Sequence, residues 1–210
     1  MPAHEGREAW FVPCDVRDFA QLEQLMAAID VRYGRLDVLI NNAGGAPYAN
    51  AAEASPRFSE AIVRLNLLAP LNLCQLANQR MQKQAGGGAI INICSVSAIR
   101  PSPGTAAYGA AKAGLLNLGR SLAVEWAPKV RVNSVIGGLI RTEQSHLHYG
   151  DEAGVARVAA SIPLGRMAEP GDIGDACLYL ASPMAAYVSG AEITLHGGGE
   201  RPAFLDAAQG

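Results

Sequence analysis

Strand-like runs that alternate with helical segments are the feature that most constrains the fold of this chain. The runs Leu36–Ile40, Ala89–Cys94 and Arg131–Val135 have the length of buried strands, and the stretches between them carry helix signals. This alternation is typical of a mostly parallel sheet that is covered by helices on both faces. Since the chain shows neither an internal repeat nor a linker, we expect residues 1–210 to form a single α/β domain.

Three of the helical segments have recognisable ends. Asp18 has the character of an N-cap, and it precedes apolar residues at helical spacing, namely Phe19, Leu22, Leu25, Met26 and Ile29. Ser55 and Pro56 form the cap and the first-turn proline of the next helix. A third helix is expected from Ala106 to Trp126, with Pro128 close to its end.

The composition excludes several function classes. Of the 210 residues, 50% are hydrophobic and 17% are charged, and the formal net charge is −2. This balance fits a domain with a sizeable core and provides no basic patch for nucleic acid. The apolar stretches are shorter than a membrane helix requires, and residues 1–7 lack the apolar centre of a signal peptide, so we expect a cytoplasmic protein without membrane contact. The four cysteines are scattered without metal-ligand spacing, which predicts reduced thiols and no metal site.

One stretch has the layout of a proton-transfer site for a carbonyl or an alcohol. Tyr108 and Lys112 lie four residues apart, so on a helix they share one face, and the ammonium would favour the phenolate form of the tyrosine. Ser95 ends the run that begins at Ala89, where a parallel strand would deliver its hydroxyl to the edge of the sheet to hold a substrate oxygen. By itself, the Tyr–Lys spacing is more often a surface pair on an alanine-rich helix.

Together with other motifs, these residues resemble the short-chain dehydrogenase/reductase family, from about Ala9 to Gly199. The motifs occur in the family's order: Asn41-Asn42-Ala43-Gly44 after a strand, Asn66 on a helix, then Ser95, Tyr108, Lys112 and the segment Gly138–Thr142. The resemblance implies a Rossmann-like, doubly wound sheet. It also implies a homodimer or homotetramer, in which the helix of Tyr108 and the preceding helix form a four-helix interface.

The resemblance implies a reaction and a role for each member of a catalytic tetrad. A hydride would pass between a nicotinamide cofactor and an alcohol or ketone, while Tyr108 exchanges the proton on oxygen. Lys112 would lower the pKa of Tyr108 and bind the nicotinamide ribose, and Ser95 would orient the substrate oxygen. Asn66 would anchor a water that links Lys112 to solvent. Taken alone, Asn66 is more often a packing or helix-kink residue, and Ser95 a strand-end hydroxyl that bonds the backbone.

The family pattern also implies residues that bind the cofactor, NAD or NADP. Asp15 and Val16 are expected at the adenine, and a second group along the ribose, nicotinamide and carboxamide: Asn41, Ala43, Gly44, Gly138, Ile140 and Thr142. Asn41 and Asn42 taken alone read more readily as turn residues. The residue that selects NAD or NADP follows the family's second strand, for which this sequence has no counterpart, so both cofactors stay open.

One family element has no counterpart in the sequence. The family opens with a strand, a Gly-rich turn and a helix that receive the cofactor pyrophosphate, whereas here the segment Ala9–Val16 already resembles the family's third strand. Either the true start lies upstream of Met1, or the chain is a shortened paralogue with a damaged cofactor site. Because the missing strand would be central, we expect an unpaired inner edge along Val38–Ile40 and poor solubility of the isolated chain.

Two function classes therefore remain. The first is an NAD(P)-dependent dehydrogenase or reductase for a small-molecule alcohol or ketone, and the alternative is a catalytically silent fragment that acts, if at all, through association with other subunits. Substrate identity is expected to depend on the segment 143–162, which carries His146, His148 and Tyr149. The sequence does not choose among steroid, sugar, polyol and acyl ketone.

Overall fold

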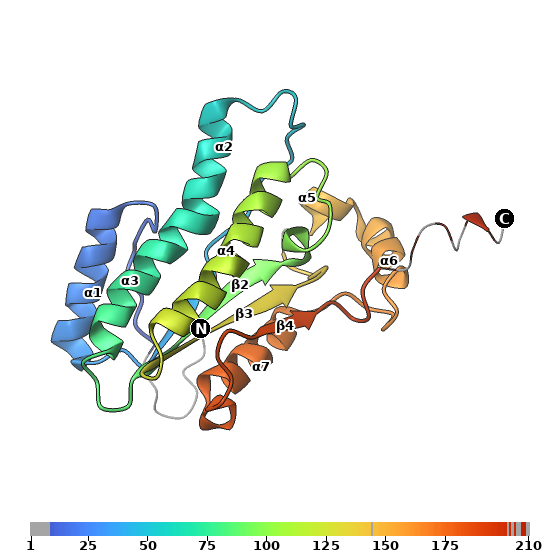
Figure 1. The fold of residues 1–210 in the computed structure, drawn as a ribbon. Helices are drawn as coiled ribbons and strands as arrows, with labels where there is room; N and C mark the ends of the chain where they lie inside the picture. Colours follow the sequence, from blue (N-terminus) through green and yellow to red (C-terminus); the bar gives the residue numbers. More distant parts are fainter. Residues whose placement is uncertain (1–8, 144, 201, 203, 205–206, 209–210) are drawn as a thin grey trace.

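A four-stranded parallel sheet forms the centre of the molecule in the computed structural model, which describes residues 9–143, 145–200, 202, 204 and 207–208 (Figure 1). The strands are β1 (Val38–Asn41), β2 (Gly88–Ser95), β3 (Val130–Gly137) and β4 (Glu192–Leu195), and they lie in the order β1-β2-β3-β4. Val38 pairs with Ala89, Gly88 with Val130, and Ser134 with Glu192. The predicted parallel sheet is confirmed, and the three predicted strand-like runs coincide with β1, β2 and β3.

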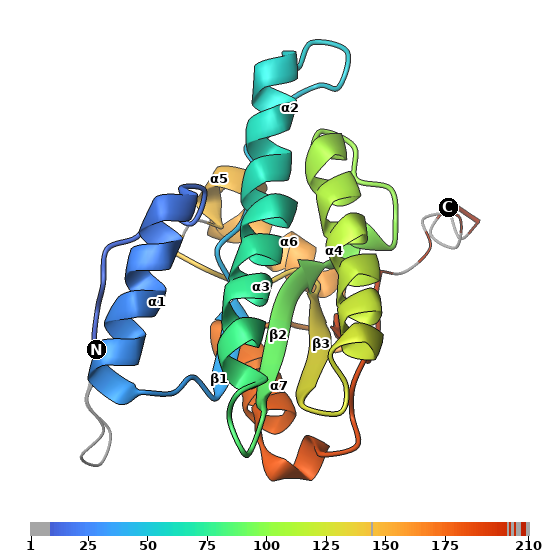
Figure 2. The ribbon, with the colours of Figure 1, turned by 60° about the vertical axis from the view of Figure 1, so that its left-hand side comes forward.

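Helices cover both faces of the sheet, as the alternating pattern predicts. The described α-helices are α1 (Phe19–Tyr33), α2 (Pro56–Val63), α3 (Ala69–Met81), α4 (Ala106–Glu125), α5 (His146–Tyr149), α6 (Glu152–Ala160) and α7 (Pro170–Ala181). Figure 2 shows α3 and α4 on one face with α1 beside α3, and α7 on the opposite face. The short helices α5 and α6 stand beyond the carboxyl ends of the strands (Figure 1).

The core follows from the two-residue period of the strands. Ile90 and Val132 lie on one face of the sheet and pack against α3 and α4. Ile91 and Val135 lie on the other face and pack against α7. All four side chains are fully buried. Full burial of such a side chain stabilises the fold by about 1.5–3 kcal/mol, so apolar residues at successive strand positions specify a sheet that is covered on both faces.

The helix signals in the sequence coincide with the helix boundaries. The Asp18 carboxylate accepts a 3.0 Å hydrogen bond from the backbone of Ala20 and caps α1. The Ser55 hydroxyl accepts a 3.2 Å bond from the backbone of Phe58 and caps α2. Each cap satisfies a backbone N–H that the helix itself leaves unpaired.

The prediction that Ala9–Val16 forms a strand is wrong. Residues 9–15 are extended but lie outside the sheet, and in the described chain β1 pairs only with β2, so the expected unpaired edge of β1 is present. A cavity of about 700 Å³, lined by Trp10, Phe11 and Val12 on one side and by Val38 on the other, separates the two segments. A segment becomes a strand only when its backbone hydrogen-bonds to a neighbouring strand. Residues 9–15 form no such bonds to β1 across this cavity.

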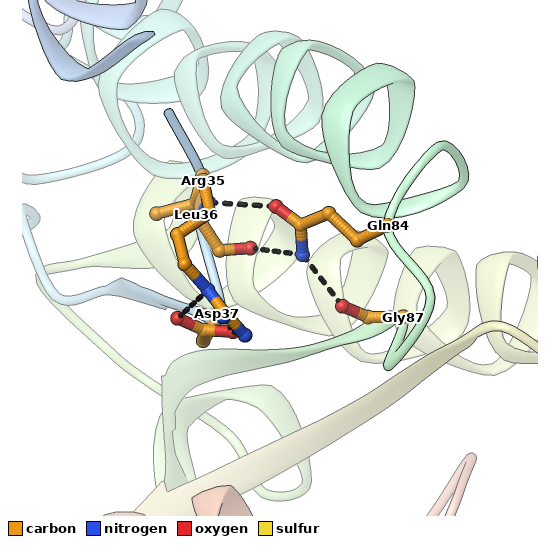
Figure 3. A network of polar contacts seen from close by, with 5 residues as sticks. All are labelled: Arg35, Leu36, Asp37, Gln84 and Gly87. Atoms are coloured by element: carbon orange, nitrogen blue, oxygen red, sulfur yellow. Dashed lines mark hydrogen bonds and ion pairs between the residues drawn. The ribbon is translucent and has the colours of Figure 1, made fainter. Parts of the chain in front are cut away.

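A glutamine side chain fixes the beginning of β1 (Figure 3). The amide of Gln84 accepts a 2.7 Å bond from the backbone N–H of Leu36 and donates to the carbonyl oxygens of Leu36 (3.0 Å) and Gly87 (2.7 Å). Gln84 thus offers Leu36 the donor and acceptor that a neighbouring strand would offer. This network, with the Arg35–Asp37 ion pair beside it, lies at the amino ends of β1 and β2.

No described helix combines the length and hydrophobicity that a membrane crossing requires. Among the described residues, His, Cys, Asp and Glu side chains do not gather in groups of three that would bind a metal ion.

Candidate active site

The candidate catalytic residues converge at the carboxyl edge of the sheet. Ser95 is the last residue of β2, and Tyr108 and Lys112 lie on the first turns of α4, which packs against β2 and β3. Asn66 lies in a π-helical turn, Arg64–Leu68, that joins α2 to α3. In open parallel sheets this edge is where ligands bind, because the loops that follow the strands meet there.

The Ser95 hydroxyl connects the strand to the tyrosine. It lies beside the Tyr108 phenol, where it opposes the rise in pKa that burial causes, and it accepts a 3.2 Å bond from the backbone N–H of Ser97. Since the Ser97 N–H occupies an acceptor position of this oxygen, the hydroxyl proton of Ser95 is free to point toward the phenol or toward an oxygen bound beside it.

Lys112 is almost completely buried, with 3% of its surface exposed. Its ammonium donates a 2.8 Å hydrogen bond to the carbonyl oxygen of Ile93 and lies 5.7 Å from the centre of the Tyr108 ring. Burial disfavours the charged form and lowers the pKa of Lys112. The ammonium is therefore held by the strand β2 and faces the flank of the tyrosine ring.

Burial dominates the pKa of Tyr108 in this structure, and the predicted effect of Lys112 on the phenolate stays a prediction. Burial raises the pKa of Tyr108, while the Ser95 hydroxyl acts in the opposite direction and only reduces the rise. The Lys112 ammonium donates its hydrogen bond to the Ile93 carbonyl oxygen and not to the phenol. The phenol is consequently held in its protonated form.

Asn66 has the role of a clamp on the loop that follows β1. Its side-chain oxygen accepts from the backbone N–H of Gly45 at 2.9 Å, and its amide donates to the carbonyl oxygens of Gly45 and Ile62, both at 2.9 Å. The residue is fully buried. In a regular α-helix the carbonyl of Ile62 would accept from the backbone N–H of Asn66. Here it accepts from the Asn66 side chain instead, and the helix widens to a π-turn at this point.

A chain of hydroxyl groups lies beneath the loop between β2 and α4. The Ser102 hydroxyl donates to the Ser97 hydroxyl at 3.0 Å and lies 2.6 Å from the Thr105 hydroxyl. Ser97 in turn donates its backbone N–H to Ser95. This chain ties the orientation of Ser95 to the first turn of α4, and it is not among the features predicted from the sequence. Its only signal is the density of hydroxyl residues between Ser95 and Thr105.

Glycine is required where the loop after β1 passes Lys112. A Cβ on Gly44 would lie 2.8 Å from the side-chain oxygen of Asn66 and 3.1 Å from the Lys112 ammonium. Gly138 is equally restricted, because a Cβ there would lie 2.8 Å from the Cα of His196. Both are residues that the sequence places at the cofactor, and both allow main chain to approach the site closely.

The other expected cofactor residues fall into two groups. Ile140 forms a bridge with Ala168, and the backbone of Thr142 donates to the Ser145 hydroxyl at 2.8 Å, so both belong to the loop after β3. Ala43 lies in the loop after β1, between Asn41 and Gly44. The Asn41 side chain turns into the core, where it donates to Asn92 at 2.9 Å and to the Cys74 sulfur at 3.2 Å.

Asp15 and Val16 lie elsewhere. The Asp15 carboxylate forms a 2.7 Å ion pair with Arg17, whose hydrogen bonds lower the pKa of Asp15 to about 2. Asp15 lines a groove of about 1190 Å³ together with Arg64 and Leu68. Val16 packs on α1 near Leu22. This pair therefore faces a different cavity from the one that Gly138 lines.

The residues around Lys112 fit the sugar hydroxyls of a nicotinamide nucleotide. An ammonium has three donors, and within the described residues Lys112 uses one of them in a hydrogen bond. Two donors of a buried cation are thus left for a polar ligand beside the space that Gly44 leaves open. For the pyrophosphate, the part of the chain that the structure describes holds no strand and Gly-rich turn ahead of α1.

The chain is similar to known proteins over most of its length. Residues 2–200 match the family model described as Enoyl-(Acyl carrier protein) reductase. The chain is 37% identical over 197 residues to the D-threitol dehydrogenase of Mycolicibacterium smegmatis, covering 93% of this chain and 73% of that protein. It is 36% identical over 194 residues to the L-rhamnose 1-dehydrogenase (NAD(P)(+)) of Azotobacter vinelandii, covering 92% and 76%. A gluconate 5-dehydrogenase from Burkholderia cenocepacia, solved in complex with NADP and tartrate, has a TM-score of 0.81 at 30% identity, covering 88% of this chain and 72% of that chain.

Proposed function

The chain belongs to the short-chain dehydrogenase/reductase family of NAD(P)-dependent oxidoreductases, and we propose that four of its residues form the catalytic site: Asn66, Ser95, Tyr108 and Lys112. The observation that carries the proposal is the convergence of Ser95, at the end of β2, with Tyr108 and the buried Lys112 on α4 at the carboxyl edge of the sheet, where the Lys112 ammonium lies 5.7 Å from the centre of the Tyr108 ring. Bound NAD(P) supplies the hydride acceptor or donor.

Tyr108 moves the proton on the substrate oxygen. In the direction of alcohol oxidation its phenolate oxygen accepts the hydroxyl proton, and in the direction of ketone reduction its phenol donates a proton to the carbonyl oxygen. Ser95 donates a hydrogen bond to the same substrate oxygen and fixes its position relative to Tyr108. Support comes from the Ser97 N–H, which holds the Ser95 oxygen in place.

Lys112 and Asn66 complete the site. Lys112 offers its two remaining donors to the ribose hydroxyls of the cofactor, and its charge stabilises the phenolate from which Tyr108 accepts the substrate proton. Asn66 anchors a water beside Lys112 through its backbone carbonyl. Pro70, four residues later, has no N–H, so this carbonyl lacks its usual helical donor. The side chain of Asn66 is already engaged with Gly45.

The expected contacts to the cofactor extend this assignment. Asp15 and Val16 contact the adenine, and the backbone of the loop Asn41–Gly44 follows the ribose. The segment Gly138–Thr142 faces the nicotinamide and its carboxamide. The loop Asn41–Gly44 and the segment Gly138–Thr142 lie at the ends of β1 and β3, on either side of Ser95, and this position supports their assignment.

The substrate is a small-molecule alcohol or ketone, and the partner is a second copy of the chain. Family members are typically oligomeric, and the outer side of α4 supports a homodimer or homotetramer here. Ala106, Ala110 and Ala113 are exposed along it, and such small residues let another helix approach closely.

A catalytically silent role is the second candidate, favoured by the unpaired edge of β1 in the described sheet. In that case the chain acts through association with other subunits. Saturable micromolar binding of NADH or NADPH, measured by energy transfer from Trp10 and Trp126, supports the enzyme. A folded chain that binds neither cofactor supports the silent role.

The substitution Tyr108→Phe tests the catalytic assignment. We expect turnover to fall below detection, because the proton acceptor is lost, while NAD(P)H affinity stays within about twofold of the original value. Tyr187→Phe is the matched control, since Tyr187 is fully exposed on the loop after α7 and should leave both quantities unchanged. Turnover that persists in Tyr108→Phe would refute the assignment.

A further inference from the structure

A small cavity opens beside the candidate active site. It has a volume of about 110 Å³ and lies between the loop after β2 and the turn after β4. Its lining includes Val96, the residue next to Ser95, and Gly138, the residue after the end of β3. The cavity is therefore placed to receive the part of a substrate that extends away from the reacting carbon.

Apolar side chains line the cavity, and its rim is charged. Ile99, Leu139 and Ile162 are among the apolar lining residues. At the rim, the guanidinium of Arg100 lies 2.6 Å from a carboxylate oxygen of Glu200, although the two residues are 100 positions apart in the sequence. Their side chains are 37% and 42% exposed, so a ligand in the cavity reaches both.

Two further elements bring polar groups to this rim. The turn after β4 has three successive glycines with positive φ, Gly197 (65°), Gly198 (98°) and Gly199 (87°), and it leads the chain to Glu200 opposite Arg100. From α5, Tyr149 lies close enough for the charges of Arg100 and Glu200 to act on its pKa, which burial raises. Its side chain also packs with Leu139 and Ile162.

Size and charge together select a class of ligand. Pockets for whole drug-sized ligands have volumes of about 300–1,000 Å³, so this cavity of about 110 Å³ receives only a small group. The charges of Arg100 and Glu200 cancel, and an anionic ligand would have to displace Glu200 from Arg100. The guanidinium provides hydrogen-bond donors, and the carboxylate beside it provides acceptors. A hydroxyl group can accept from the first and donate to the second.

We propose that Arg100 and Glu200 are specificity-determining residues that select short, uncharged substrates with neighbouring hydroxyl groups. One hydroxyl carbon reacts at Ser95 and Tyr108, and the adjacent hydroxyls bond the ion pair at the rim. This inference rests on the proposed function, because it needs the reacting carbon at Ser95.

Turnover and binding are measured with three probes: erythritol, 2-butanol and gluconate. We expect kcat/KM with NAD(P)+ to be at least tenfold higher for erythritol than for 2-butanol, which has no second hydroxyl. Arg100→Gln should remove this preference and leave kcat/KM for 2-butanol within about twofold of the original value.

Glu200→Gln should raise the ratio of kcat/KM for gluconate to that for erythritol, because Arg100 is then released for a carboxylate. Arg35→Gln removes an exposed ion pair at the other end of the sheet and is the control.

Saturation-transfer NMR separates this proposal from the proposed function. We expect a transfer signal for erythritol that is lost in Arg100→Gln and kept in Arg35→Gln. If no alcohol is turned over, the proposed function fails, and the NMR comparison still decides the role of the ion pair. Equal signals from erythritol and 2-butanol, a stronger signal from gluconate, or an erythritol signal that survives in Arg100→Gln would each overturn the inference.

Discussion

The side chain of Asn66 pairs with both backbone polar groups of Gly45, accepting from its N–H and donating to its carbonyl oxygen, each at 2.9 Å. This pairing sets the path of the loop after β1, and the same loop passes the Lys112 ammonium at Gly44. The shape of the loop beside the buried cation therefore depends on one amide in a π-helical turn.

Asn66→Ala should lower the free energy of unfolding by about 2–3 kcal/mol, because buried backbone groups of Gly45 and Ile62 lose their partners. Urea unfolding measures the change. Asn117→Ala, at an exposed position on α4, is the control and should stay within about 0.5 kcal/mol. An equal effect of the two substitutions would contradict the clamp.

The rate of alcohol oxidation should rise with pH through the whole range in which the protein is stable. Only the phenolate of Tyr108 accepts the substrate proton, and since burial raises its pKa above the ordinary value of about 10, its fraction grows about tenfold for each pH unit below that value. Ketone reduction uses the phenol and should stay flat between about pH 6 and 9. Profiles of kcat/KM in both directions test this, and a plateau in oxidation near neutral pH would contradict it.

Ser102→Ala should lower kcat about fivefold, because the Ser97 hydroxyl loses a hydrogen bond and Ser95 is held less firmly. KM for the cofactor should not change, and Ser102→Thr should restore most of kcat because it keeps the hydroxyl. Steady-state kinetics measures both parameters. Ser121→Ala is the control, since Ser121 is exposed on α4. A proportional loss in all three variants would show that Ser102 does not act through Ser95.

Gln84→Glu should lower the free energy of unfolding by about 1–3 kcal/mol and leave kcat unchanged. The carboxylate still accepts from Leu36, but it faces the carbonyl oxygens of Leu36 and Gly87 without the two donors of the amide. Thermal and urea unfolding measure the loss. Gln79→Glu, exposed on α3, introduces the same charge and should have little effect.

Ile40→Lys should reduce self-association of the chain. Ile40 lies on β1 at the edge of the described sheet and is 44% exposed, so a charge there disfavours pairing with another strand. Sedimentation velocity over a range of concentrations measures the effect. Val31→Lys, on the exposed side of α1, is the matched control and should leave association as it is.

Local signals in the sequence predict much of the fold because their causes are local. The caps at Asp18 and Ser55 act within four residues, and the strand period decides which side chains of β2 face which helices. Ala9–Val16 shows the limit of this reasoning. Its composition permits a strand, but pairing depends on a neighbour that the segment does not have.

The candidate site is predictable only in part for a similar reason. Ser95, Tyr108 and Lys112 are brought together by one strand and the helix that follows it, as the sequence predicts. The direction of the Tyr108 pKa shift is set by the burial of the phenol in the folded chain, which no spacing in the sequence predicts. Nearly half of the chain separates Arg100 from Glu200, and no spacing in the sequence predicts their contact.

The Gln84 network lies at the amino ends of β1 and β2, whereas the candidate catalytic residues and the rim of the small cavity lie at the carboxyl ends. The register of the sheet and the choice of substrate are thus encoded by residues that do not touch. Evolution, or a protein engineer, is free to exchange residues around Arg100 and Glu200 for a new substrate without disturbing the amide that aligns the strands.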